Sequence, residues 1–163
     1  MNLKKTKNLL LALVFSAYVL PYPGFMPGNK IYRLKQIADY VGQYWAFGSL
    51  TRYKYELSLA DKKLVEAKTL FEYSQYPLAL KALLDSDWHF QQASNYLTQA
   101  KKEGKDITQK ETLFKSAAQK HIEVLKQLEQ NLPESFLWQP EKKDSLVLEI
   151  RNALEAAIKI REL

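Results

Sequence analysis

Cysteine is absent from this chain of 163 residues. The protein therefore has no disulfide framework, no thiolate nucleophile and no thiolate metal site. The sequence also lacks the Gly-x-Ser-x-Gly nucleophile motif, a glycine-rich phosphate loop, the dinucleotide-binding glycine pattern and a His-Glu-x-x-His zinc motif. Enzyme is the function class that the sequence supports least, and we expect neither catalytic residues nor a cofactor.

Histidine is scarce, with two residues in the whole chain. His89 stands one helical turn after Asp85, which is a spacing that metal sites use, but Asp87 would project from a different side of the same helix. No histidine-rich second helix supplies the missing ligands, so we expect no metal site here. His121 lies on an apolar stripe and is expected to be a core residue with its hydrogen bonds satisfied.

The excess of positive charge is small once its distribution is considered. The chain has 24 basic and 18 acidic residues, a net charge of +6. Three of the basic residues, Lys4, Lys5 and Lys7, lie at the N-terminus without an acidic neighbour, which leaves 21 basic against 18 acidic residues, or +3, for the remainder. An excess of this size does not indicate a nucleic-acid partner.

Residues 1–17 have the pattern of an export signal. The N-terminal lysines precede an apolar run from Leu9 to Leu20, and Pro21 ends any helix there. A helix of this run would be about 18 Å long, whereas the hydrocarbon core of a membrane is about 30 Å thick. The pattern favours a signal peptide over a conventional transmembrane helix, and it predicts an extracytoplasmic location in the periplasm or cell envelope, secreted or membrane-anchored. An uncleaved signal anchor, with membrane association through this segment, and an N-terminal core helix of a cytosolic protein are the alternatives.

Residues 18–29 are predicted to form an extended segment. Pro21, Pro23 and Pro27 alternate with Gly24 and Gly28, a composition that favours a polyproline-like path. Such a stretch is stiff and exposes few amide donors. We expect it to lie along a helix surface, with the side chains of Tyr22 and Phe25 inserted between helices.

Residues 30–163 are predicted to form a single helical domain, so the fold class is all-α, an antiparallel helical hairpin or bundle of about five helices. The first helix, from Lys30 to Phe47, has apolar residues around more than half of its circumference. This breadth predicts that the helix lies in a groove between other helices. The functional alternative is an exposed aromatic surface for a partner or for the membrane surface, formed by Tyr40, Tyr44 and Phe47.

The next two helices carry the most regular apolar pattern of the chain. Spacings of three and four residues recur in the second helix at Leu50, Tyr53, Leu57, Ala60, Leu64, Ala67 and Phe71, and in the third at Ala79, Leu83, Ser86, Phe90, Ala93, Leu97 and Ala100. A short turn with Pro77 joins these two seams. Two seams of equal length on either side of a short turn predict an antiparallel hairpin with arms of about 25 residues.

Two further helices are expected after Gly104, which is predicted to be a left-handed cap. Thr108 and Glu111 have the spacing of a capping box, which would open a fourth helix ending at Pro133. A loop over residues 133–139 is expected to insert its apolar side chains into the end of the bundle. A last helix is expected to begin at Pro140, with Val147 among its inward-facing residues, and no strand is predicted.

Two blocks of residues resemble a known family. Leu20-Pro21-Tyr22-Pro23-Gly24-Phe25-Met26-Pro27 precedes Ile31-Tyr32-Arg33-Leu34-Lys35, and the second helix contains Leu59-Ala60-Asp61-Lys62-Lys63-Leu64-Val65-Glu66-Ala67. In this order the blocks resemble the bacterial family catalogued as domain of unknown function 5667. The motif residues are Pro21, Pro23, Gly24, Pro27, Tyr32, Leu34, Lys35, Leu59, Ala60, Asp61, Lys62, Lys63, Leu64, Glu66 and Ala67.

The resemblance covers roughly residues 20–100 and has two departures. Asn29-Lys30 replaces the usual Ser-Pro or Asn-Pro helix start, and Met26 replaces a usual leucine. The resemblance implies an exported helical domain and brings no known activity or catalytic residue.

The charged residues of the second block are expected to form a solvated face. Asp61 would pair with Arg52 or Lys54, and Lys62 with Glu66 one turn later. A docking surface is the functional alternative for this face.

Three hypotheses about function follow. The first is a non-enzymatic interaction or structural module of the cell envelope, with an unknown protein partner. The second is a periplasmic chaperone-like or ligand-binding helical protein, although the Leu-Thr-x-x-Gln motif of well-known helical chaperones is absent. The third is a membrane-tethered regulatory domain, which requires that the N-terminal segment is retained.

Overall fold

The computed structural model describes residues 18–24, 26–27, 34, 37–38, 47–141 and 144–162. The predicted signal at residues 1–17 and the motif or surface residues Tyr32, Lys35, Tyr40 and Tyr44 lie outside these residues. No helix among the described residues is long and apolar enough to cross a membrane.

The two regular seams of the sequence form the predicted antiparallel hairpin. Helix α3 (Ser49–Glu72) and helix α4 (Tyr76–Lys102) have 24 and 27 residues, close to the expected length. All the predicted seam residues are buried except Leu50, which is partly buried and packs against the core. Pro77 lies in the first turn of α4, where its missing N–H leaves no intrahelical bond unmade.

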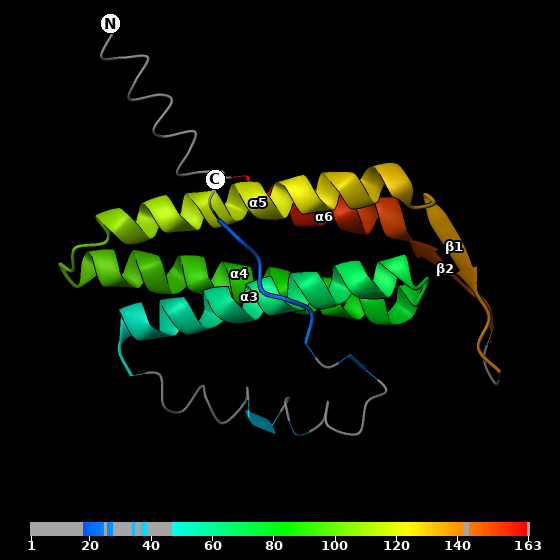
Figure 1. The fold of residues 1–163 in the computed structure, drawn as a ribbon, viewed down its shortest axis with the longest axis horizontal. Helices are drawn as coiled ribbons and strands as arrows, with labels where there is room; N and C mark the ends of the chain where they lie inside the picture. The colour runs from blue at the N-terminus through cyan, green and yellow to red at the C-terminus, as the bar shows by residue number, and fades with distance from the viewer. Residues whose placement is uncertain are drawn as a thin grey trace, which may run out of the picture.

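Helix α5 (Thr108–Asn131) and helix α6 (Ile150–Arg161) complete the helical part. In Figure 1, α5 and α6 lie together on one side of the α3–α4 hairpin, and α6 contacts both α4 and α5. Among the described residues the fold therefore consists of four helices and a small sheet. The all-α prediction is correct for the helical layers but does not include the sheet.

The predicted loop and the start of the predicted last helix form a β-hairpin instead. Strand β1 (Ser135–Trp138) pairs antiparallel with strand β2 (Leu146–Glu149). The prediction of inserted apolar side chains is wrong, because Phe136, Leu137 and Trp138 remain 38%, 60% and 36% exposed. The prediction for Val147 is also wrong, since it lies in β2 and is 52% exposed. Periodicity does not distinguish a helix from a strand in apolar runs as short as these, and the helix begins only at Ile150.

The turn between α4 and α5 confirms one prediction and corrects another. Gly104 has a φ of +75°, in the left-handed region expected for a helix cap. The capping box is wrong, because Thr108 is already the first residue of α5 and the N-cap residue Ile107 forms no side-chain cap hydrogen bond. The N–H of Thr108 instead donates to the carboxylate of Asp106 at 3.0 Å.

An extended segment crosses the bundle near its middle, as Figure 1 shows for the residues coloured blue. Residues 18–24 and 26–27 are called the N-terminal strap here. Leu20 and Met26 of the strap pack against the core, and the hydroxyl of Tyr18 donates to Asp61 of α3. The expected insertion of Tyr22 is wrong, since its side chain is 92% exposed. Phe25 lies outside the described residues.

The described apolar residues of the first predicted helix, three of them large, are exposed. Leu34 and Ile37 are 65% and 58% exposed, and Phe47, just before α3, is 78% exposed. These side chains do not lie in the groove between helices that their periodicity predicts. Of the aromatic surface considered as the alternative, only Phe47 falls within the described residues.

Within the described part of the chain, most buried apolar residues belong to two clusters, one in each half of the bundle. One cluster combines the second half of α3, the first half of α4, the end of α5 and α6. The other combines the first half of α3, the second half of α4 and the start of α5. Asp61, Ser86, Asp87 and His121 lie between these clusters on their respective helices. A layer of polar residues therefore separates two apolar halves.

Candidate functional site

Six residues from five segments form this internal polar layer. Tyr18 comes from the strap, Asp61 from α3, Ser86 and Asp87 from α4, His121 from α5 and Arg161 from α6. These residues are called the polar layer below. Ser86 and His121 are 0% exposed and Arg161 is 1% exposed, so the layer is sealed from solvent over most of its extent. Buried polar groups are stable only when they are hydrogen-bonded, and each of these six has a partner in the layer.

Arg161 is the residue with the most contacts in the layer. Its Nη1 donates to Asp87 Oδ1 at 2.5 Å and to the carbonyl of Ala157 at 2.8 Å, and its Nη2 donates to Ser86 Oγ at 2.9 Å. The hydroxyl of Ser86 in turn donates to the carbonyl of Ala60 on α3. The guanidinium also lies over the ring of Phe90, 5.1 Å from its centroid. Arg161 therefore joins α6 to α4, and through Ser86 to α3.

The protonation state of His121 follows from its two partners. Arg161 Nε donates to His121 Nδ1 at 3.0 Å, and a guanidinium has no acceptor, so Nδ1 must carry the lone pair. His121 Nε2 then bears the proton and donates to Asp61 Oδ1 at 2.8 Å. Burial lowers the pKa of His121, and the positive charge of Arg161 lowers it further, against the opposing effect of Asp61. The imidazole is neutral, with a single defined tautomer.

Asp61 connects the layer to the strap. Its Oδ1 accepts from His121, and its Oδ2 accepts from the hydroxyl of Tyr18 at 2.7 Å. Burial raises the pKa of the Tyr18 phenol, and the neighbouring Asp61 carboxylate raises it further, so Tyr18 remains a hydrogen-bond donor. On the other side of the layer, burial raises the pKa of Asp87, with Arg161 opposing this change.

The solvated face predicted for the second family block is wrong in two of its residues. Asp61 and Glu66 are 9% and 4% exposed. Asp61 bonds to Tyr18 and His121 rather than pairing with Arg52 or Lys54, and Glu66 forms an ion pair with Lys63 at 3.1 Å, three residues away. Asp61 lies one turn after Leu57 and one before Leu64, beside the seam, so helix α5 and the strap cover it. The motif aspartate thus has a structural partner in each of two segments.

The structure does not bring Asp85, Asp87 and His89 together. Asp87 accepts a hydrogen bond from Arg161. His89 Nδ1 lies 2.6 Å from Glu56 Oε2, and Asp85 Oδ2 lies 3.8 Å from Lys63 Nζ. Within the described part of the chain, no group of three or more His, Asp or Glu residues is arranged to hold a metal ion. His121 has the satisfied core position that its apolar stripe predicts.

An open apolar groove of about 440 Å³ lies between α4 and α6. Leu84 and Trp88 project from α4 and are 67% and 51% exposed, although both are large apolar residues. On the α6 side the wall consists of Ala153, Ala156 and Ile160. The sequence reasoning missed this groove, because an apolar residue outside a seam gives no indication of whether a second helix will cover it.

The β-hairpin continues the apolar surface from one end of this groove. Glu149, the last residue of β2, lines the groove. Leu137 pairs with Val147 and Trp138 with Leu146, and all four are at least 36% exposed. Phe136 lies against Tyr76, with ring centroids 4.6 Å apart, and anchors the base of the hairpin to α4. Both strands thus carry exposed apolar side chains, which is unusual for an isolated monomer.

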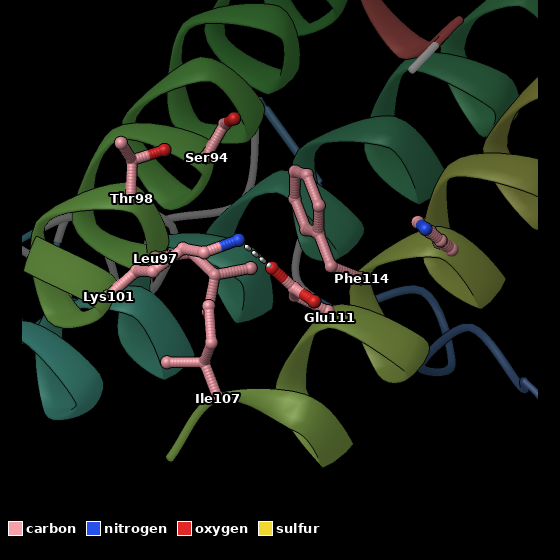
Figure 2. Close-up of a pocket in the computed structure, with 8 residues that line it drawn as sticks. Ser94, Leu97, Thr98, Lys101, Ile107, Glu111 and Phe114 are labelled. Atoms are coloured by element: carbon pink, nitrogen blue, oxygen red, sulfur yellow. Dashed lines mark hydrogen bonds and ion pairs between the residues drawn. The ribbon is translucent and has the colours of Figure 1, made fainter. Parts of the chain in front are cut away.

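A second groove, of about 520 Å³, lies between the end of α4 and the start of α5. Figure 2 shows Ser94 and Thr98 on one wall and the Lys101–Glu111 ion pair, 3.3 Å long, spanning the opening. Its floor consists of Leu97, Ile107 and Phe114, each no more than 7% exposed. These floor residues therefore belong to the core, whereas Leu84 and Trp88 of the first groove are more than half exposed.

The sequence contained a signal for Arg161 that the periodicity argument did not use. The inward stripe Ile150, Leu154 and Ala157 continues at a spacing of four to Arg161. A buried position for an arginine implies a buried acidic partner, but the sequence does not indicate which acidic residue that is. For Tyr18, in contrast, no periodic pattern exists.

The comparisons with known proteins identify the family and nothing further. A family model described as domain of unknown function (DUF5667) matches residues 24–135. No curated protein and no solved structure matches the chain. The match begins within the first block of the sequence resemblance, so it does not include Pro21 or Pro23, and it extends past the second block through α5 to the first residue of β1. It includes Asp61 and His121 but neither Tyr18 nor Arg161. Because the model matches more than half of the chain, the protein belongs to the family of domain of unknown function 5667.

Proposed function

We propose that this protein is a non-enzymatic interaction module of the cell envelope, which binds an amphipathic helix of a protein partner in the groove between α4 and α6. The exposure of Leu84 and Trp88 along that groove carries the proposal. Contiguous exposed apolar surface on a folded domain favours a docking role. The apolar hairpin at one end of the groove enlarges the same surface.

The shape and charge of the groove favour a helix as its occupant. The small side chains of Ala153 and Ala156 allow a third helix to approach α6 closely, while Leu84 and Trp88 provide the apolar wall opposite. The ionisable residues that line the groove, Asp87 and Glu149, are both acidic, and Asp87 is already paired with Arg161. A partner helix with a cation beside the hairpin end of its apolar face would complement Glu149.

The burial of the polar layer supports the non-enzymatic part of the proposal. His121 and Asp61 are held against each other, but His121 has no exposed surface from which to act on a substrate. Substrate chemistry requires a concave site where the reacting groups converge. The open groove is lined mainly by apolar side chains.

The envelope location rests on the N-terminal sequence alone. The three lysines and the short apolar run before Pro21 are typical of an export signal. Fractionation with an intact-mass measurement tests this part. Recovery of the mature protein from the envelope fraction supports export, whereas the intact chain in the cytosol contradicts it.

A membrane-tethered regulatory domain is the second candidate, because the strap is attached to the bundle. If residues 1–17 remain as an anchor, the strap fastens the domain to that anchor through Tyr18, Leu20 and Met26. Intact-mass measurement separates the two candidates, since only the regulatory domain requires an uncleaved N-terminus.

A photo-crosslinking amino acid at position 84 tests the docking proposal in cells. We expect a crosslinked protein from position 84 and none from position 113, because Leu113 is an exposed leucine of α5 outside the groove. The crosslink should disappear with Ala156→Trp, which fills the groove, and persist with Glu155→Trp, which adds the same bulk at a neighbouring exposed position of α6. Crosslinks that are equal at both positions, or only to lipid, would contradict the proposal.

A further inference from the structure

The N-terminal strap and helix α6 contact opposite ends of the polar layer. Tyr18 of the strap donates to Asp61 Oδ2, while Arg161 of α6 donates to His121 Nδ1. Asp61 and His121 lie between them and share one hydrogen bond of 2.8 Å. Three hydrogen bonds in series therefore connect the two segments: Tyr18 to Asp61, Asp61 to His121, and His121 to Arg161.

Each bond in this series has one allowed direction. The guanidinium of Arg161 only donates and the Asp61 carboxylate only accepts, so His121 must accept at Nδ1 and donate at Nε2. The Tyr18 hydroxyl is then the second donor to the same carboxylate. A change at one end cannot be compensated by reversing a bond at the other.

We propose that the strap is a latch for the C-terminal helix: release of Tyr18 from Asp61 weakens the hold of His121 on Arg161 and increases the opening of α6. Release of α6 in turn weakens the attachment of the strap, because coupling between two equilibria is reciprocal. The strap thereby controls an element on the side of the bundle where the α4–α6 groove lies.

The physical basis is the carboxylate that both segments share. Asp61 is 9% exposed with the strap in place, and Tyr18 is one of its two hydrogen-bond donors described here. Loss of the strap removes that donor and admits water to the edge of the layer. Water then competes for Asp61, and the bond from His121, which fixes the imidazole toward Arg161, loses strength.

Simple packing of the strap predicts a different result. Leu20 and Met26 pack against the apolar cluster that includes α3, α4, α5 and α6 together. If packing were the only contribution, loosening the strap would reduce the stability of all four helices alike. The latch instead predicts an effect that is selective for α6.

The absence of native cysteine allows single thiols to report local opening. Ile158→Cys, on the buried face of α6, reports release of that helix, and Leu83→Cys, on the buried face of α4, reports opening of the hairpin. Both are introduced into the full-length chain in a mild detergent, and thiol labelling is measured under conditions where its rate follows the opening equilibrium.

Tyr18→Phe is the decisive variant, because it removes only the hydroxyl that bonds to Asp61. We expect labelling of the Ile158→Cys reporter to accelerate about 10-fold to 100-fold, the range for a lost hydrogen bond to a charged group, with a smaller change at Leu83→Cys. Tyr22→Phe is the matched control, since it removes a hydroxyl from the same strap at a side chain that is 92% exposed, and we expect no change. Equal acceleration at both reporters, or none at either, would overturn the latch.

The reverse direction provides a second test that does not depend on Tyr18→Phe. Arg161→Lys keeps a positive charge near Asp87 but removes the Nε donor to His121. A Leu20→Cys reporter in the strap should then be labelled faster than in the chain with Arg161. An unchanged rate at this reporter would show that the two segments are independent and would overturn the proposal.

Discussion

The middle of the bundle and the α4–α6 side of its surface have opposite compositions. Between the two apolar clusters lie a tyrosine, two aspartates, a serine, a histidine and an arginine, all hydrogen-bonded. On the surface lie Leu84, Trp88 and the hairpin residues Leu137 and Val147, each more than half exposed. The comparison shows that the placement of polar and apolar residues in this chain is not decided by stability alone.

The difference indicates two separate requirements. A polar layer with directional hydrogen bonds accepts only one alignment of the helices that contribute to it, whereas apolar contacts tolerate sliding by a turn. We interpret the layer as a device that specifies the alignment of α3, α4, α5 and α6. The exposed apolar side chains contribute little to that alignment and form the proposed docking surface. Four experiments test the difference between these two regions.

Arg161→Met should have the largest effect on stability. It leaves Asp87, which is 7% exposed, without its ion-pair partner, and we expect the free energy of unfolding to fall by about 3–5 kcal/mol. Urea unfolding followed by circular dichroism measures the change. The control is Lys159→Met on the exposed side of α6, where we expect a change within about 0.5 kcal/mol. Similar values for both variants would show that the layer is dispensable.

The adjacent leucines of α4 test the apolar half of the comparison. Leu83 is 1% exposed and Leu84 is 67% exposed. Leu83→Ala should lower the free energy of unfolding by about 2–5 kcal/mol, because it creates a cavity in the core. Leu84→Ala should change it by about 0.5 kcal/mol or less. A large loss for Leu84→Ala in the same urea experiment would place that side chain among the structural residues and argue against a docking role.

The pH dependence of stability tests the neutral state of His121. The pKa of His121 is lowered in the folded protein by burial and by Arg161, against the effect of Asp61, while in the unfolded chain it is about 6.5. As the pH falls below that value, the unfolded chain binds a proton that the folded protein does not, so the folded protein loses stability. Above a pH of about 6.5, His121 is neutral in both states and does not make the free energy of unfolding depend on pH.

His121→Gln is the matched variant for this measurement, since glutamine retains one acceptor and one donor but does not titrate. The free energy of unfolding is measured at a series of pH values between 7.5 and 5.5, on the order of one unit either side of the pKa of histidine in the unfolded chain. Between these two limits, it should fall less for the variant than for the parent chain. Identical slopes would mean that His121 is not held neutral.

Substitutions in the β-hairpin should have the smallest effect on stability. Leu137→Thr and Val147→Thr replace two paired, exposed side chains with a residue that strands accept, so the free energy of unfolding should change by about 0.5 kcal/mol or less. Urea unfolding followed by circular dichroism measures the change. Phe136→Thr is the contrast, because it removes the ring that lies against Tyr76 and should destabilise the base of the hairpin. An equal loss of unfolding free energy in all three variants would show that the whole hairpin contributes to the core.

The α3–α4 hairpin could be predicted because its information is local. Residues such as Leu57, Leu64 and Phe90 recur at helical spacing on both sides of a short turn, and two such seams have one way to cover each other. The predictions of a left-handed Gly104 and a buried His121 were correct for the same reason, because each rested on the sequence immediately around the residue.

The errors concern features that depend on a third element. Asp61 lies beside the seam, and only the positions of α5 and the strap decide that it is covered. The pairing of β1 with β2 depends on contacts between two short apolar runs separated by residues 139–145, where helix and strand cannot be told apart by periodicity. The groove exists because no described element packs over Leu84, and a sequence pattern does not show which apolar side chains stay uncovered.

The distance along the chain between Asp87 and Arg161 sets the order in which the interior can be completed. These two residues are 74 positions apart, and Ser86 is 75 positions from the same arginine. A chain made from its N-terminus can form the α3–α4 hairpin long before residue 161 is available, and until then it has an aspartate on the buried face of α4 without a counter-ion. During synthesis, closure of the interior is therefore a late event that waits for the last turn of α6.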